Sequence, residues 1–187
     1  MQIISLSNKK AIRQEVLIRC AELYCAIWKE EPWNEDFWTV PGVLEDMHLE
    51  FAKPKAEALI VLNDNKDVIG FTWGYSVSRE ELQEISGGNF FSNFFGKADS
   101  IFYVDELGVS SIFRVKGIGK IISQMLIENV MGRCIEKIVL RTDVKAVVAR
   151  ILYEKLGFKE LNIFDQTHPE RTYWLLDLKK DYNIHQY

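Results

Sequence analysis

The stretch FRVKGIGKII, residues 113–122, decides the expected fold, because it joins an apolar strand to an amphipathic helix through a turn with two glycines. The segment before it, FYVDELGVS (102–110), has the apolar pattern of a strand. The first turn of a helix leaves about four N–H groups without partners and carries about half a positive charge. Glycine there lets a ligand approach the backbone closely. The junction is therefore a candidate anion site, and phosphate is the usual ligand.

Two phosphate-binding motifs can be compared with this turn position by position. A Walker A loop needs glycine at 114 and serine or threonine at 121, where the chain has Arg114 and Ile121. A dinucleotide fingerprint that begins at Gly117 needs a third glycine at 122, where Ile122 stands. Neither motif fits. On the turn alone, a phosphate site and a tight corner without a ligand stay equally open.

The composition predicts one globular domain with a sizeable core. The chain has 187 residues, of which 48% are hydrophobic and 27% are charged. A net charge of -4 gives no bias toward nucleic acid or membrane. No apolar run approaches a membrane span, and the N-terminus MQIISLSNKK is too short for a signal peptide. The three cysteines lack metal-ligand spacing, so we expect a cytoplasmic protein without a metal. A homodimer stays open.

Patterns of apolar residues place the other elements. They predict a strand at 2–6, helices over 7–28 and after Gly42, a hairpin of strands 58–62 and 68–77, a strand at 101–109, a helix at 117–131, a strand at 137–142, a helix at 145–156 and a final strand pair at 158–164 and 171–178. This order predicts a single α/β (α+β) domain, with a mixed sheet covered by helices.

Three helices are expected to bury an apolar stripe. The stripe of the first helix begins at Ile12, and that of the helix after the glycine turn includes Ile121. In the last helix, Val148 and Ile151 belong to the stripe and Tyr153 falls beside it.

The region 78–100 differs in character from its surroundings. REELQEISGG (79–88) predicts one or two helical turns that end at two glycines, and NFFSNFFG (89–96) carries four phenylalanines. Linkers are rarely so aromatic, so we interpret the region as an insertion or lid.

Two segments resemble one protein family. LGVSSIFRVKGIGKIISQML (107–126) resembles the pyrophosphate-binding motif of the GNAT superfamily of acyl-CoA N-acyltransferases, which reads Arg or Gln, two residues, Gly, one residue, then Gly or Ala. Members often have glycine at the position of Val115 and proline at that of Ser111. ARILYEKLGF (149–158) is similar to the family's C-terminal helix and following strand, with Ala146 where an asparagine is usual.

The order of elements also matches the family over residues 2–178. The chain is thus identified as a GNAT member, with one N-acetyltransferase domain over 1–187 and a lid or insertion at 78–100. The resemblance implies a mostly antiparallel, twisted sheet of about seven strands with four or more helices.

The resemblance implies acetyl-CoA as the co-substrate. Its pyrophosphate is expected on the N–H groups of the turn, and its pantetheine arm along the backbone of Leu107 and Val109, with Gly108 easing the approach. The implied cofactor-binding residues are Leu107, Gly108, Val109, Arg114, Val115, Lys116, Gly117, Ile118, Gly119 and Lys120.

Acetyl transfer to an amine requires an amine without its extra proton. An alkylammonium with a pKa near 10.4 is deprotonated in about one molecule per thousand or fewer at pH 7. A nearby carboxylate can take that proton. The resemblance places Asp105 at the position of the base, and Glu106, on the opposite face of a regular strand, is the alternative. A plain surface carboxylate also stays open. Tyr153 occupies the family's position for the proton donor to the leaving thiolate.

The cysteines suggest no acyl-enzyme, so we expect direct transfer in a ternary complex with an amine acceptor. WKEEPWNEDFW (28–38) mixes tryptophans with carboxylates, a combination that suits a cation. We predict that Trp33 and Glu35 bind a cationic primary amine. The alternatives are inward-packed tryptophans on a solvated acidic loop, and for the whole chain a catalytically silent CoA-binding or regulatory domain, or a protein-interaction domain.

Overall fold

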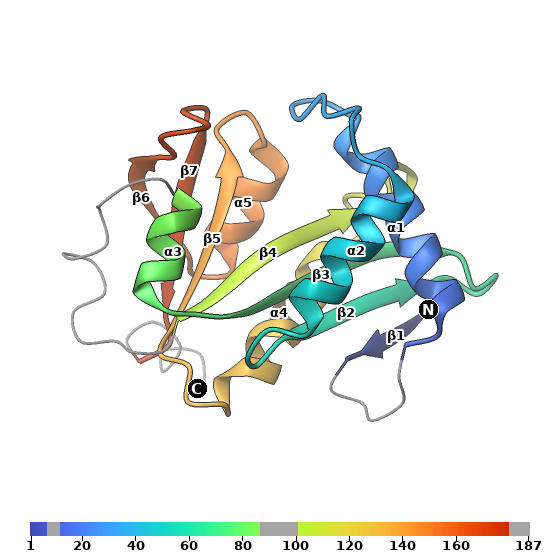
Figure 1. Cartoon of the computed structure of the whole chain (residues 1–187), viewed down its shortest axis with the longest axis horizontal. Helices are drawn as coiled ribbons and strands as arrows, with labels where there is room; N and C mark the ends of the chain where they lie inside the picture. Colours follow the sequence, from blue (N-terminus) through green and yellow to red (C-terminus); the bar gives the residue numbers. More distant parts are fainter. Residues whose placement is uncertain (7–11, 87–100, 180–187) are drawn as a thin grey trace. The chain divides into compact units, whose positions relative to one another are not determined.

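The computed structural model describes residues 1–6, 12–86 and 101–179 (Figure 1). Its elements in chain order are β1 (Gln2–Ser5), α1 (Gln14–Trp28), α2 (Val40–Phe51), β2 (Glu57–Leu62), β3 (Val68–Val77), α3 (Arg79–Ser86), β4 (Ile101–Val109), the 3-10 turn η2 (Ser111–Phe113), α4 (Ile118–Met131), β5 (Lys137–Asp143), α5 (Val147–Lys155), β6 (Lys159–Phe164) and β7 (Arg171–Asp177). The predicted helical turns at 79–88 are present as α3. The aromatic segment 89–96 lies outside the described residues.

The described strands form one sheet in the order β1-β2-β3-β4-β5-β7-β6. The pair β4–β5 is parallel. The pairs β1–β2, β2–β3, β5–β7 and β6–β7 are antiparallel. The predicted class, a mixed and mostly antiparallel sheet with helices, is confirmed.

The chain divides into two compact units. The first comprises Met1–Tyr75 and Asp105–Leu126, and the second comprises Ser76–Val104 and Ile127–Tyr187. Strands β3 and β4 contribute to both.

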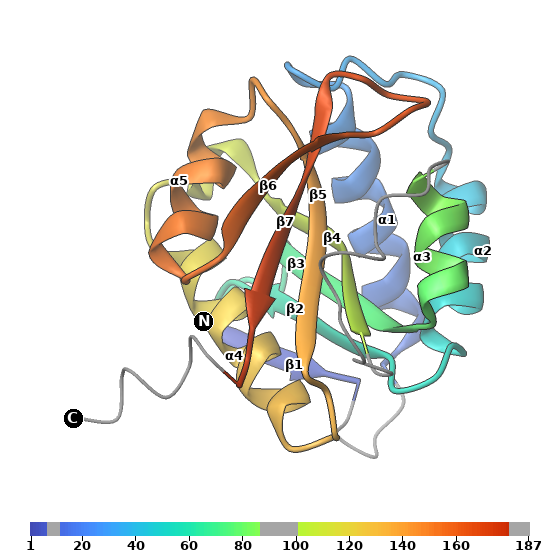
Figure 2. The ribbon, with the colours of Figure 1, turned by 90° about the vertical axis from the view of Figure 1, so that its left-hand side faces the viewer.

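The first unit is built on the predicted hairpin, β2 and β3, in which nearly every residue is buried. Strands read as continuous apolar runs when both of their faces are covered. Helices α1 and α2 pack on one face. The start of α4 lies on the other face of these strands, with Ile118 near Gly70. Figure 2 shows α1 and α4 on opposite sides of β2 and β3.

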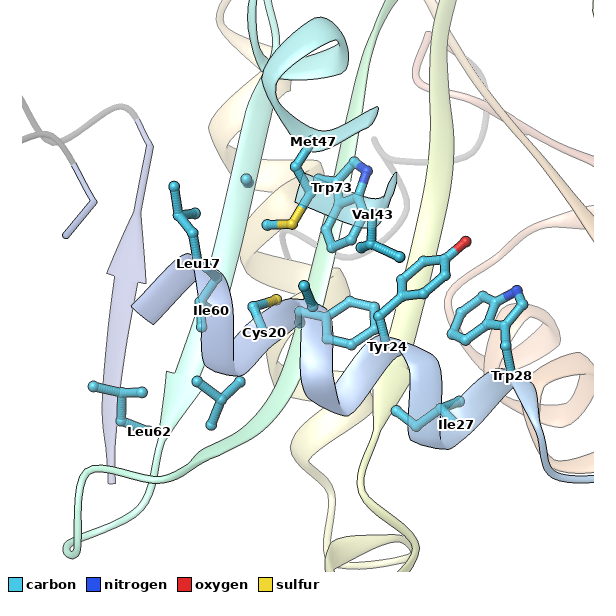
Figure 3. Close-up of a cluster of buried hydrophobic side chains, with 14 residues drawn as sticks. Leu17, Cys20, Tyr24, Ile27, Trp28, Val43, Met47, Ile60, Leu62 and Trp73 are labelled. Carbon is cyan, nitrogen blue, oxygen red and sulfur yellow. The ribbon is translucent and has the colours of Figure 1, made fainter. Parts of the chain in front are cut away.

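The core under α1 is rich in aromatic rings (Figure 3). The Tyr24 ring stacks on Trp28 and meets Trp38 edge to face. It also stacks on two rings of β3, Phe71 and Trp73. Each such ring buries a large area, so this cluster contributes much of the unit's stability.

Two helices begin elsewhere than predicted. Helix α1 begins at Gln14, so Ile12 lies outside it. Helix α2 begins at Val40, earlier than expected, because the Thr39 side chain accepts a hydrogen bond from the Gly42 N–H and Pro41 fits the first turn.

Two predicted stripes were partly wrong. Ile121 is exposed, because the buried line of α4 starts at Ile118 and repeats every four residues. In α5, Val148 and Ile151 are exposed and Tyr153 is buried.

The second unit has its own polar anchor. The buried Asp165 carboxylate accepts hydrogen bonds from Arg141 at 2.6 Å and from the Tyr173 hydroxyl at 2.9 Å. The N–H groups of Thr167 and His168 donate to its other oxygen, which fixes the loop between β6 and β7.

Within the described parts of the chain, no helix is both long and apolar enough to cross a membrane.

Candidate functional site

The glycine turn is a strand–turn–helix junction, as expected. Strand β4 ends at Val109, Arg114 is extended, and the first hydrogen bond of α4 runs from the Ile121 N–H to the Gly117 carbonyl at 3.0 Å. The N–H groups of residues 118–120 therefore precede the helix's own hydrogen-bond ladder and lie at its positive end.

Two residues of the turn have left-handed backbone. Gly117 has φ +83°, and a Cβ added there meets nothing within 4 Å. Its conformation, and not crowding, therefore calls for glycine, and the space before it is open to a ligand. Val115 has φ 60° and is 91% exposed. A β-branched residue is strained in this region, where family members often carry glycine.

Two basic side chains at the rim, Arg114 and Lys116, contact the protein itself. Arg114 donates from Nε to the Val109 carbonyl at 2.9 Å, and its Nη1 lies 2.5 Å from Glu30 Oε2. Lys116 donates to the Ile112 carbonyl at 2.9 Å. The first residue of the motif is thus held against both the end of β4 and the loop after α1.

Gly108 is a glycine for a reason that the sequence did not suggest. A Cβ there would lie 2.5 Å from Phe71 Cζ and 2.9 Å from Ile27 Cδ1. Core packing beneath α1 thus calls for glycine at this position. Its neighbours Leu107 and Val109 are half-buried at the end of β4.

The two candidate bases are each held by a tyrosine. The Tyr75 hydroxyl donates to Asp105 Oδ2 at 2.7 Å, and the Tyr24 hydroxyl donates to Glu106 Oε1 at 2.9 Å. Burial and then the charge of Glu106 raise the pKa of Tyr24, and Asp105 adds to the effect. Both carboxylates thus act on one phenol, although a regular strand would direct them to opposite faces.

Glu50 is a third carboxyl of this group, and the sequence analysis missed it. Burial, followed by the charge of Asp105 and a hydrogen bond to it, raises the pKa of Glu50 to about 8. The Trp73 indole donates to Glu50 Oε2 at 2.6 Å. Its position in the sequence could have indicated this. Glu50 follows the buried Met47 by three residues in α2, so an acid lies beside the apolar stripe of the helix.

Tyr153 belongs to the second unit and is 7% exposed. Its ring centroid lies 5.9 Å from that of Phe158 and 6.0 Å from that of Trp174. The ring is thus fixed between α5, the start of β6 and β7.

The loop after α1 continues the aromatic cluster. Trp33 stacks on Trp28 with centroids 6.0 Å apart, and Trp28 stacks on Tyr24 at 4.4 Å. Trp28 is buried and Trp33 is half-buried, so the tryptophans pack inward to different degrees. The Trp38 indole donates to Glu35 Oε2 at 2.7 Å, which ties the loop's acid to the same cluster.

Comparison with known proteins agrees with this fold. A family model described as the acetyltransferase (GNAT) family matches residues 18–158. Because the match covers most of the chain, the protein belongs to the GNAT family and is an acetyltransferase of that family. Enzymes of this family use acetyl-CoA as the acetyl donor. Among curated protein sequences, none matches the chain.

Solved structures match over nearly the whole chain. A ribosomal-protein-alanine N-acetyltransferase from Brucella melitensis has a TM-score of 0.69 at 14% identity, covering 95% of this chain and 100% of that one. A GNAT-family acetyltransferase from Staphylococcus aureus has a TM-score of 0.67 at 15% identity, covering 95% and 99%. Arabidopsis thaliana NAA60 in complex with acetyl-CoA has a TM-score of 0.62 at 15% identity, covering 95% and 99%. At these identities the likeness shows the fold.

Proposed function

We propose that this protein transfers an acetyl group from acetyl-CoA directly to a cationic primary amine of a small molecule or peptide. The observation that carries the proposal is the turn from Arg114 to Lys120 at the positive end of α4, with left-handed backbone at Val115 and Gly117. Family membership and a structural neighbour in complex with acetyl-CoA support the donor.

The residues of the turn fit an acyl-CoA. The N–H groups of residues 115–120 bind the pyrophosphate, and the open space before Gly117 lets it reach them. Arg114 supplies a charge-assisted hydrogen bond. The backbone of Leu107 and Val109 pairs with the pantetheine amides, beside Gly108. When bound, the cofactor supplies a thioester carbonyl to the amine.

Asp105 accepts the proton of the bound ammonium, with Glu106 as the alternative base. The freed nitrogen attacks the thioester carbonyl, a C–N bond forms, and the C–S bond breaks. The leaving thiolate takes a proton from the Tyr153 hydroxyl. Direct transfer is supported by Cys20, whose pKa is raised by burial and then by Glu106, because such a thiol forms a nucleophilic thiolate poorly.

The acceptor is proposed to bind at the loop after α1. Trp33 and Glu35 combine an indole face with a carboxylate, which suits a primary ammonium. The stacking of Trp33 on Trp28 and the hydrogen bond from Trp38 to Glu35 support the proposal, because both hold these side chains in place before the acceptor arrives.

Isothermal titration with acetyl-CoA tests the donor, and an absence of binding at hundreds of micromolar would overturn the proposal. Gly117→Glu is expected to weaken binding, because it strains the backbone and brings a negative charge to the phosphate site. Gly132→Glu is the control, since Gly132 lies beyond the other end of α4 in open space.

A panel of aminoglycosides, polyamines, amino acids and peptides, scored by thiol release, tests the acceptor. Asp105→Asn and Tyr153→Phe then separate an enzyme from a catalytically silent CoA-binding domain. We expect each to lower turnover by about tenfold or more. Wild-type turnover in both variants would reject the catalytic assignments.

A further inference from the structure

Glu50 and Asp105 are each held by a side chain of β3, and the charge of Asp105 acts on Glu50. An ionised carboxylate only accepts hydrogen bonds, so a proton is what can join two neighbouring carboxyl groups. Glu50 comes from α2 and Asp105 from β4, and both belong to the first unit. Residues from two elements thus form a carboxyl pair.

The pair is fixed on both sides by residues of β3. The Trp73 indole donates to Glu50 Oε2 at 2.6 Å, and the Tyr75 hydroxyl donates to Asp105 Oδ2 at 2.7 Å. Residues two apart in a strand share one face, so a single strand positions both donors. Because one oxygen of each carboxyl is occupied, the pair has a defined geometry.

The surroundings of the pair are mostly acidic. The charged and titratable groups that face it are Tyr24 on α1, Asp46 and Lys53 on α2, Tyr75 on β3, and Glu106 on β4. Lys53 is the cation among them, and its Nζ lies 3.7 Å from the centroid of the Tyr75 ring. Burial, then Glu45 and Asp105, raise the pKa of Asp46, which shows that the acids repel one another.

The electrostatics agree with the geometry. The pKa of Glu50 is raised to about 8, first by burial and then by the neighbouring Asp105. Burial and the neighbouring charge thus favour the protonated form of Glu50.

We propose that Glu50 is a positioning residue that shares one proton with Asp105, so that the pair, and not Asp105 alone, accepts the proton of the acceptor amine. This inference rests on the proposed function. The fully ionised pair receives a proton from the bound ammonium and returns to the shared state, and the nitrogen lone pair becomes available for attack. No other reactant is consumed in this step.

The chemical advantage lies in matched basicity. A lone surface carboxylate with a pKa near 4 is too weak a base for an alkylammonium near 10.4. When two carboxyl groups share one site, the proton that is lost last has a raised pKa. The basicity of the ionised pair is then closer to that of the amine.

Titration of the carboxyl carbons by NMR, without acetyl-CoA, tests the pair. We expect one glutamate signal with a midpoint near pH 8, which Glu50→Gln removes. In Asp105→Asn the midpoint falls by at least about one unit, because the neighbouring charge is lost, but stays above that of free glutamate because burial persists. Glu45→Gln, the same change at an exposed site on α2, is expected to leave the midpoint unchanged.

Ethylammonium chloride tests whether the pair meets amines. We expect it to lower the Glu50 midpoint more than sodium chloride does at equal ionic strength, since a bound cation favours the ionised pair. A Glu50 midpoint below about pH 6, or one that Asp105→Asn leaves unmoved, overturns the shared proton. Equal effects of the two salts overturn the contact with amines. Failure of acetyl-CoA to bind is a separate result, and it rejects the proposed function without altering these titrations.

Discussion

Arg114 and Glu30 form an ion pair with 2.5 Å between Arg114 Nη1 and Glu30 Oε2. The pair links the first residue of the glycine turn to the loop after α1. Both side chains are about one third exposed, so the pair contributes little to folding stability. The pair matters for cofactor binding, because the Glu30 carboxylate binds the guanidinium that we expect to contact the cofactor's phosphates.

Replacing Arg114 and replacing Glu30 are expected to have opposite effects on the affinity for acetyl-CoA. Arg114→Ala removes a charge-assisted hydrogen bond and is expected to weaken binding by about tenfold or more. Glu30→Gln removes a competing negative charge and is expected to tighten binding by about two- to fivefold. Isothermal titration measures both, with Glu31→Gln, an exposed neighbouring acid, as the control. Weaker binding in Glu30→Gln would instead mean that Glu30 orients Arg114 for the cofactor.

The sequence predicted most of the elements because their patterns are local. The β2–β3 hairpin follows from two apolar runs around Asn63–Lys66, and the turn before α4 follows from its glycines. The predicted start of α2 was wrong because Thr39 caps the helix and Pro41 stands in its first turn, where proline does not break a helix.

The chemistry of the site was less accessible, because it depends on contacts between residues far apart in the chain. Asp105 and Glu106 were found by position in a motif. Glu50 was missed because its role arises only where α2 brings it to β3 and β4. Likewise, Gly108 is explained by the Phe71 ring of another strand, which periodicity cannot reveal.

Gly108→Ala is expected to destabilise the protein by about 1–3 kcal/mol. The new Cβ would lie 2.5 Å from Phe71 Cζ, and a buried aromatic ring cannot move aside without disturbing the cluster beneath α1. Gly132→Ala is the matched control, because its Cβ meets nothing within 4 Å. Chemical denaturation measures both. A Gly108→Ala variant as stable as the control would contradict the packing at this position.

Val115→Asn is expected to stabilise the protein by about 0.5–1 kcal/mol. Val115 has φ 60° and is 91% exposed, so the change relieves strain and breaks no packing. Asparagine adopts left-handed backbone more readily than a β-branched residue. The control is Val147→Asn, an exposed valine in the first turn of α5. Thermal unfolding that ranks Val115→Asn at or below wild type would argue against the strain.

The Glu50–Asp105 pair predicts a pH dependence of stability. The folded-state pKa of Glu50, about 8, lies above the ordinary value of 4.5. The folded protein therefore binds more protons between these values, and the contribution of Glu50 to stability is lost as the pH rises from about 4.5 through 8. Glu50→Gln lacks this loss.

The comparison is made by urea unfolding of wild type and Glu50→Gln at about pH 5 and about pH 9. We expect similar stabilities at the lower pH and an advantage for the variant at the higher pH. Titrating groups away from this cluster are the same in both proteins and cancel in the difference. A stability difference that does not change with pH would show that Glu50 titrates in its ordinary range.

Trp33 and Glu35 are predicted to determine how well the acceptor binds. Trp33 stacks on Trp28, and Glu35 is held by the Trp38 indole, so alanine at both positions removes an indole face and a carboxylate together. We expect the double variant to raise the acceptor KM by about tenfold or more, because cation–π and charge contributions of about 0.5–2 kcal/mol each are lost. Acetyl-CoA affinity, measured by titration, is expected to change by less than about twofold, since the glycine turn is untouched.

Thermal unfolding controls for lost stacking, and Glu31→Gln controls for the loss of an acid from the same loop. Unaltered acceptor kinetics in a folded double variant would place the acceptor elsewhere.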